Sequence, residues 1–127
     1  MLYMDLILAC YTKNYFNFGG RASRKEFWLF KLTSFLLPFT FGMLTIIFSN
    51  LIGLETSVQA QKLMLIPLLV LIFSIVPLWS VSVRRLHDIN RSGMWLALWL
   101  LPFGHLVLII LFCIKGNKEL NKYGSPS

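Results

Sequence analysis

Long apolar stretches dominate the pattern of hydrophobic and polar positions in this chain of 127 residues. Three of them, Leu32–Leu54, Leu63–Val83 and Met94–Ile114, contain no Asp, Glu, Lys or Arg, and each is 21 to 23 residues long. With a rise of 1.5 Å per residue, about 21 helical residues reach roughly 31 Å, enough to cross a bilayer core of about 30 Å. The pattern predicts an all-α integral membrane protein with three membrane-embedded helices.

The polar positions divide this single membrane domain, residues 1–127, into segments. Residues 1–20 mix aromatic and polar side chains, which fits a short helix lying in the membrane interface, with a frayed tail as the alternative. The predicted membrane helices and the polar tail occupy residues 24–54, 63–88, 94–114 and 115–127. A short polar turn between the first two helices makes them antiparallel neighbours.

Two local signals refine the first two helices. Ser23 followed by Glu26 forms a capping box, in which each side chain bonds the backbone amide of the other, so the first helix is expected to begin at Arg24. Pro77 removes the hydrogen bond to the Phe73 carbonyl inside the second helix and should kink it. Ser74 and Ser80 are candidates to satisfy the freed backbone.

The third apolar stretch is interrupted by Pro102-Phe103-Gly104. It is either one kinked crossing or a re-entrant hairpin of two short helices. A full crossing places eight of the 12 Lys and Arg on the side of the N-terminus, whereas re-entrance places eleven there. The charge count favours re-entrance and the length favours crossing, and we expect a crossing. In both cases the positive-inside rule places the N-terminus and the Arg84–Arg91 loop in the cytoplasm.

Composition supports the membrane assignment and limits the chemistry. Charged residues make up 13% of the chain, against about a quarter in soluble domains. The net charge of +7 comes from basic residues that flank apolar stretches, which favours anionic phospholipid headgroups over nucleic acid as partners. Two Cys and two His without ligand spacing predict neither a metal site nor a cofactor.

An arginine-rich group is expected where the first helix begins and the second ends. If these helices are antiparallel neighbours, the basic residues before and at the start of the first face those at the end of the second. The candidate residues for binding a headgroup or an acidic partner are Arg21, Arg24, Glu26, Arg84, Arg85, His87, Asp88 and Arg91. Asp88 lies near a helix C-terminus, where the dipole disfavours an acid, and this indicates that it pairs with Arg84 or Arg85. General grounds favour an interfacial anchor with ordinary salt bridges.

Three motifs in order resemble a known family. They are Gly20-Arg21-Ala22-Ser23-Arg24-Lys25-Glu26-Phe27-Trp28, Arg84-Arg85-Leu86-His87-Asp88-Ile89-Asn90-Arg91-Ser92-Gly93 and Asn121-Lys122-Tyr123-Gly124-Ser125-Pro126. Together they are similar to the bacterial inner-membrane family of domain of unknown function 805, the YhaH-like proteins. Met94-Trp95 and Lys118-Glu119 depart from the pattern, in which many relatives have two aromatic residues and a Pro-Gly pair. The resemblance implies a small helical protein of the inner membrane and supplies no established activity.

Three functions compete. The expected one is a non-enzymatic membrane module whose cytoplasmic arginine platform binds anionic lipid or an acidic partner, because guanidinium groups suit phosphate. The alternative is an oligomeric transporter or channel subunit, for which His105 is the ionisable residue inside the third stretch. An enzyme acting on lipid phosphates is less favoured, because His87 and Asp88 are consecutive and point about 100° apart on a helix. A homo-oligomer or a membrane-protein partner is compatible with the expected function.

Overall fold

The computed structural model describes residues 3–53, 62 and 65–126, and within them it is helical. Its elements in chain order are α1 (Tyr3–Tyr11), α2 (Arg24–Leu51), α4 (Leu65–Asp88), the 3₁₀-helix η1 (Gly93–Leu100) and α5 (Gly104–Cys113). The described residues form no β-strand, only one isolated bridge between Asn121 and Gly124. The all-α class is therefore confirmed. The predicted turn between the first two long helices lies, except for Lys62, outside the described residues.

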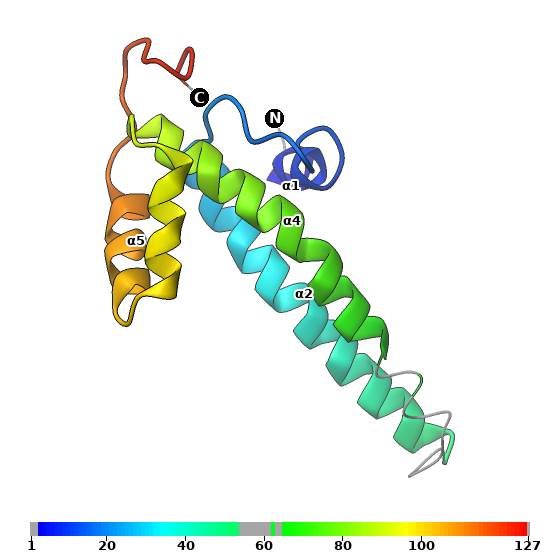
Figure 1. Cartoon of the computed structure of the whole chain (residues 1–127). Coiled ribbons are helices and arrows are strands. Elements are labelled where there is room, and N and C mark those ends of the chain that lie inside the picture. The colour runs from blue at the N-terminus through cyan, green and yellow to red at the C-terminus, as the bar shows by residue number, and fades with distance from the viewer. Residues whose placement is uncertain (1–2, 54–61, 63–64, 127) are drawn as a thin grey trace.

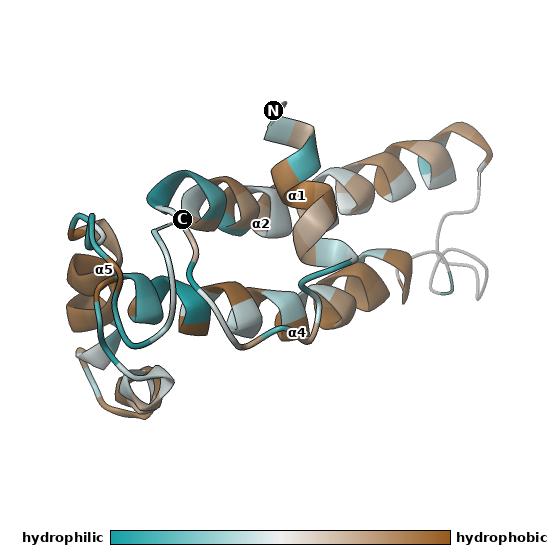
Figure 2. Cartoon of the chain, turned by 90° about the horizontal axis from the view of Figure 1, so that it is seen from above, coloured by the Kyte–Doolittle hydropathy of each residue, from teal (hydrophilic) through white to brown (hydrophobic). Residues whose placement is uncertain are grey.

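Helices α2 and α4 form a long antiparallel pair, with α1 packed across one part of it (Figure 1). Both are long and apolar enough to cross a membrane. Only 17% and 22% of their most apolar stretches are buried within the protein, unlike the core helices of a soluble domain. Viewed from above, the two helices are largely hydrophobic, while hydrophilic segments gather at the end near α5 and the C-terminus (Figure 2). The apolar surface of this pair is therefore available to lipid.

Helix α2 begins at Arg24, as predicted, but only half of the capping box forms. The Ser23 hydroxyl accepts a hydrogen bond of 3.2 Å from the Glu26 amide. The Glu26 carboxylate points elsewhere and accepts a bond of 2.7 Å from Arg84 Nη1. A charged partner on the neighbouring helix is a stronger attraction for a carboxylate than a backbone amide. The Glu26 side chain therefore links α2 to α4 instead of completing the capping box with the Ser23 amide.

The hydrogen bond that Pro77 removes from α4 is replaced by the segment that follows α1. The Tyr15 hydroxyl donates to the Phe73 carbonyl over 2.8 Å, and this is the carbonyl that Pro77 leaves without an amide donor. Ser74 and Ser80, the candidates from the sequence, make other bonds: Ser74 donates to the Val70 carbonyl, and Ser80 contacts backbone carbonyls of the same N-terminal segment. The proline therefore creates a docking point for the N-terminal segment.

The third apolar stretch forms a hairpin, so the expected full crossing is wrong. η1 has eight residues and α5 has ten, which gives lengths of roughly 16 Å and 15 Å, about half of a bilayer core. Pro102 disfavours helical backbone at the preceding residue, and Leu101 is extended there, with φ −94° and ψ 140°. Phe103 then reverses the chain in the left-handed region, with φ 67°. Gly104 allows the reversed chain to approach the Leu98 carbonyl, where a Cβ atom would collide with the backbone.

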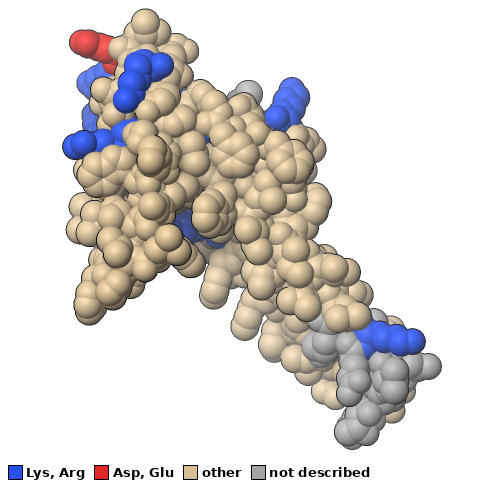
Figure 3. Space-filling model, viewed as in Figure 1, with Lys and Arg blue, Asp and Glu red and all other residues tan. Residues whose placement is uncertain are grey.

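The hairpin brings the C-terminal tail back to the end of the molecule that carries the N-terminal segment. The Asn117 amide donates to the Asp88 carbonyl over 2.9 Å, next to the end of α4. Eleven of the 12 Lys and Arg consequently belong to this end, and Lys62 belongs to the connection at the other. Figure 3 shows basic groups at both ends and, apart from one in the notch beside the hairpin, an uncharged surface between them. This is the charge distribution that re-entrance predicts.

Candidate functional site: a buried ion cluster at the end of the helix pair

Helix α4 ends in a motif that fixes the position of Asp88. Asn90 takes a left-handed conformation, with φ 58°, which Asn tolerates better than most residues. The Arg91 amide then bonds the Leu86 carbonyl at 2.9 Å, and the Asn90 amide bonds the His87 carbonyl at 3.0 Å. These two bonds constitute a Schellman C-cap. Asp88 is thereby held in the last turn of α4, beside carbonyl groups that repel its charge.

Two buried arginines compensate the charge of Asp88. Arg21 Nε donates to Asp88 Oδ1 over 2.9 Å, and Arg21 Nη2 lies 2.8 Å from the same oxygen. Arg85 Nη1 pairs with Asp88 Oδ2 from one turn earlier on α4. The side chains of Arg21, Arg85 and Asp88 are 1%, 0% and 6% exposed. The pairing predicted for Asp88 is confirmed with Arg85, and Arg21 is its second partner.

The same two arginines hold the hairpin end and the tail through backbone carbonyls. Arg85 Nε donates to the Phe112 carbonyl over 3.2 Å, and Arg85 Nη2 donates to the Ile114 carbonyl. Arg21 Nη1 donates to the Glu119 carbonyl over 2.9 Å, and Arg21 also bonds carbonyls of Asn117 and Gly124. A guanidinium group offers five donors in a planar fork, so it can join several chain segments at once. Arg21 and Arg85 therefore connect the end of α4 to the end of α5 and to the tail.

A second ion pair joins α1, α2 and α4. Arg84 Nη1 lies 2.7 Å from Glu26 Oε1, and Arg84 Nη2 donates to the Cys10 sulfur over 3.8 Å. The Cys10 thiol in turn donates to Glu26 Oε1 at 3.6 Å. Burial, and then the Glu26 carboxylate, raise the pKa of Cys10 from 9.0 to about 11, although Arg84 opposes the shift. We call Arg21, Glu26, Arg84, Arg85 and Asp88 the ion cluster.

His87 faces the tail and does not pair with Asp88. Its Nδ1 lies 3.2 Å from the Gly20 carbonyl, and its ring stacks on Tyr123 with the two centroids 3.7 Å apart. Asn121 Nδ2 donates to the His87 carbonyl over 2.9 Å. Each of these contacts joins the end of α4 to a segment distant in the sequence. His87 thus helps to seat the tail, and within the described residues no carboxylate pairs with its ring as it would to orient a general base.

The candidate residues fall into a buried and an exposed set. Arg21, Arg84, Arg85, His87 and Asp88 are buried and bonded to other parts of the protein, and Glu26 is largely buried with them. Arg24 and Arg91 are exposed: Arg24 reaches the Cys113 carbonyl at 3.4 Å, and Arg91 lies over the Trp95 ring at 5.1 Å. The structure therefore brings the candidates to one end, but the arginines at its centre face inward.

The sequence did not reveal how much of the cluster comes from the tail. The tail acceptors are backbone carbonyls, which carry no sequence signal. Gly116 was a usable signal, because a Cβ atom there would collide with the Asp88 carboxylate. Lys31, a basic residue of the first predicted helix, lies apart from the ion cluster in a separate pocket beside the hairpin. Its place seven residues after Arg24, about 10 Å along the helix, could have set it apart.

Metal binding has no support in the described part of the chain. Within residues 3–53, 62 and 65–126, no three His, Cys, Asp or Glu side chains gather as metal ligands would. Cys10 and Cys113 are free thiols, one buried and one exposed.

Comparison with known proteins gives a family and several relatives. The model of the family described as "Protein of unknown function (DUF805)" matches residues 15–125. The inner membrane protein YhaI of Escherichia coli (strain K12) is 38% identical over 114 residues, 89% of this chain and 87% of the relative. The inner membrane protein YhaH of the same strain is 36% identical over 113 residues, 88% of each chain. The uncharacterized protein YiiR of that strain is 28% identical over 142 residues, 88% of this chain and 86% of the relative. No solved structure matches.

Proposed function

We propose, from the premise that the chain belongs to the DUF805 family, that it is a non-enzymatic module of the bacterial inner membrane which presents a fixed basic surface to anionic lipid headgroups. The family model covers most of the chain, and the YhaI and YhaH relatives are described as inner membrane proteins. Helices α2 and α4 span the bilayer, and the η1–α5 hairpin enters from the same side as the N-terminus. This side is cytoplasmic.

The charge distribution supports this orientation. Eleven of the 12 basic residues belong to the end that carries the N-terminal segment, the end of α4 and the tail. The positive-inside rule applies to short segments that flank membrane helices, as all of these do. Each helix of the hairpin is about half as long as the bilayer core is thick, which supports its entry and return on one side of the membrane.

The observation that carries the proposal is the division of the basic residues into two sets. The arginines of the ion cluster are bonded internally, so they fix the shape of this end. A second set is exposed there, and we call it the basic rim: Arg24, Lys25, Arg91, Lys115, Lys118 and Lys122. None of the salt bridges found among the described residues involves the rim. Its cations are therefore available to headgroups, each worth about 1 kcal/mol near an anionic surface.

An enzymatic role has less support. The His87 ring is stacked on Tyr123, and Asp88 is held by two arginines, so neither is arranged to activate a nucleophile. The family description and the names of the relatives contain no enzymatic activity.

The test compares lipid retention by rim variants in nanodiscs of phosphatidylglycerol and phosphatidylethanolamine. Lys25→Gln, Lys115→Gln and Lys118→Gln together remove three rim charges. Within residues 3–53, 62 and 65–126, these three side chains make no hydrogen bond, salt bridge or ring contact. We expect the anionic lipid in the shell around the protein to fall and its salt dependence to weaken. Lys62→Gln, at the opposite end, is the control and should change neither. An unchanged shell in the triple variant would refute the proposed function.

Orientation is tested separately, with single cysteines in a background that lacks Cys10 and Cys113. Cysteines at Ser23 and Ser92 should react with impermeant reagents only from the cytoplasmic side, and a cysteine at Ser125 should do the same because the tail returns. Reaction of Ser125→Cys from the opposite side would show that the third stretch crosses the membrane.

A further inference from the structure

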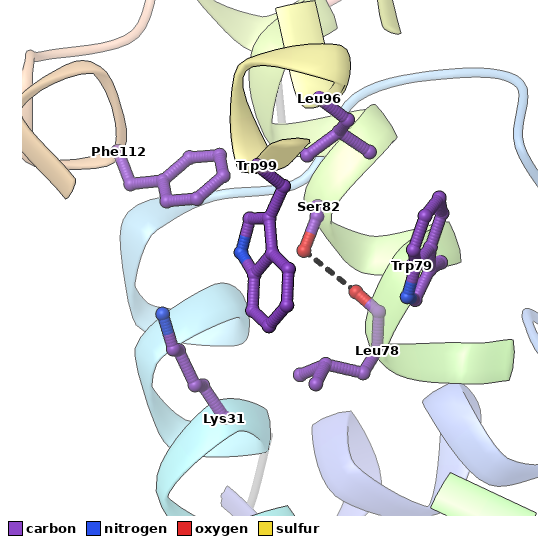
Figure 4. A pocket seen from close by; sticks show the side chains of 7 residues that line it. All are labelled: Lys31, Leu78, Trp79, Ser82, Leu96, Trp99 and Phe112. Carbon is purple, nitrogen blue, oxygen red and sulfur yellow. Dashed lines mark hydrogen bonds between the residues drawn. The ribbon is translucent and has the colours of Figure 1, made fainter. Parts of the chain in front are cut away.

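A pocket lies between the two long helices and the hairpin, apart from the ion cluster. Its volume is about 90 Å³, room for a group of several atoms, since one water needs about 10–15 Å³ by this measure. The lining comes from four elements: Lys31 of α2, Leu78, Trp79 and Ser82 of α4, Leu96 and Trp99 of η1, and Phe112 of α5 (Figure 4). The pocket therefore exists only because the hairpin folds back against the helix pair.

Lys31 brings a cation into this pocket without an acidic partner. Its Nζ lies 5.4 Å from the ring centroids of Phe27 and Trp28 and 5.7 Å from that of Phe112. No salt bridge or hydrogen bond of Lys31 is found within the described ranges. Aromatic faces attract an ammonium group, but they cannot accept its three hydrogen bonds as oxygen atoms do. The Lys31 ammonium therefore offers the pocket both a positive charge and N–H donors that are free to bind a ligand.

The other polar groups of the pocket point to an anionic ligand as well. The Trp99 indole nitrogen lies on the ring edge turned toward Phe112 and Lys31 (Figure 4), and an indole N–H is a donor only. The Ser82 hydroxyl donates to the Leu78 carbonyl at 2.6 Å, so its proton is already engaged. No Asp or Glu lines the pocket. A ligand with a cationic group would find no carboxylate, whereas an anionic oxygen would find two donors.

We propose that this pocket binds the phosphate of an anionic phospholipid, with Lys31 Nζ paired to a phosphate oxygen and the Trp99 N–H donating to another. The proposal rests on the membrane placement in the proposed function. Lys31 lies about 10 Å along α2 from Arg24, below the basic rim and near the boundary between headgroups and acyl chains.

The exposed surface around the pocket decides for a lipid over a soluble anion. Trp79 and Trp99 are 53% and 69% exposed, and tryptophan is typical of the membrane interface. The cavity is too small for a whole lipid, so the acyl chains lie outside it, along the apolar surfaces of α4 and the hairpin. A phosphatidylglycerol headgroup carries no cation, unlike phosphatidylethanolamine, whose ammonium would lie beside Lys31 without a carboxylate to compensate it.

The experiment measures lipids retained after release of the protein from nanodiscs with equal amounts of phosphatidylglycerol and phosphatidylethanolamine, by native mass spectrometry. We expect the wild-type protein to retain one phosphatidylglycerol per chain, and Lys31→Met to lower its retention roughly tenfold or more. Lys62→Met, which removes a cation at the opposite end of the helix pair, outside the basic rim, is the control and should retain this lipid. Trp99→Phe should weaken retention less, because it removes one donor and keeps the ring.

Three outcomes would overturn the proposal. They are equal retention by Lys31→Met, no preference for phosphatidylglycerol over phosphatidylethanolamine, and Lys31-dependent stabilisation by inorganic phosphate that equals that by the lipid. Lys31→Arg separates binding from folding, because it keeps the charge and should keep the lipid even if Lys31→Met unfolds. Loss of the anionic shell in the rim variant with retention of the single tight lipid would support both proposals. An intact shell in the rim variant with a Lys31-dependent lipid would refute only the proposed function.

Discussion

Replacing Asp88 by Asn should lower the stability of the folded protein more than replacing Glu26, the other acid of the ion cluster, by Gln. The carboxylate compensates two guanidinium groups, Arg21 and Arg85, whose side chains are 1% and 0% exposed. Removing one partner of a buried ion pair costs about 3–5 kcal/mol, because the remaining charge stays buried without compensation. An amide still accepts a hydrogen bond, and Arg85 keeps the Phe112 and Ile114 carbonyls, so we expect the lower end, about 3 kcal/mol.

The measurement is the free energy of unfolding in mixed detergent micelles, together with trypsin cleavage of the folded protein. The tail is held by Arg21 and by the end of α4, so its release should let trypsin cleave the backbone after the exposed Lys118 and Lys122 while the helix pair remains intact. Glu26→Gln is the matched control, because Glu26 compensates only Arg84 and is 12% exposed. It should cost about 1–3 kcal/mol and leave the tail protected. If Asp88→Asn stays within about 0.5 kcal/mol of the wild type, with its tail protected, the cluster does not stabilise this end.

Two further predictions concern the hairpin and the cysteines. Gly104→Ala should open the hairpin and expose the pocket, because a Cβ atom there collides with the backbone of Leu98. Gly42→Ala is the control and should be tolerated or stabilising, because its new methyl group meets no neighbouring atom within 4 Å. Intrinsic tryptophan fluorescence and thermal unfolding would measure both effects, and equal behaviour of the two variants would contradict the prediction. Cys10 should resist N-ethylmaleimide at pH 8 while the exposed Cys113 reacts, because a pKa raised to about 11 keeps the buried Cys10 thiol protonated. The stabilisation linked to this pKa shift is fully present below pH 9.0 and is lost as the pH rises toward 11. Mass spectrometry of the labelled peptides would detect an early reaction of Cys10, which would contradict the prediction.

Much of the architecture could be predicted because its signals are local. Ser23 and Glu26 marked the start of α2, and the predicted helix ranges 24–54 and 63–88 agree with α2 and α4 to within a few residues at each end. An acid at the end of a helix indicated that Asp88 needs a cationic partner, and Arg85, three residues earlier, is within reach on the same helix. These inferences depend on helix geometry alone, so they needed no knowledge of distant residues.

The third stretch shows where local signals were insufficient. Its length of 21 residues satisfied the criterion for a crossing, and Pro102 alone is compatible with a kink. What decides for a hairpin is the left-handed Phe103 together with the contact of Gly104 with the Leu98 carbonyl. Among the sequence signals, only the summed charge of the tail pointed in this direction. The charge of the tail indicates on which side of the membrane the tail lies, and this does not depend on the conformation of the apolar stretch before it.

The sequence by itself determined the two long helices, the family and the gathering of basic residues at one end, because hydrophobicity, capping and charge act along the chain or as sums over segments. Only the tertiary structure decided which of these cations are internal and which are free to bind. Arg21 meets Asp88 across 67 positions and the Glu119 carbonyl across 98, and Lys31 meets Phe112 only because the hairpin folds back. Burial and compensation depend on what surrounds a charge in three dimensions, so residues of one type in one short motif can have opposite roles.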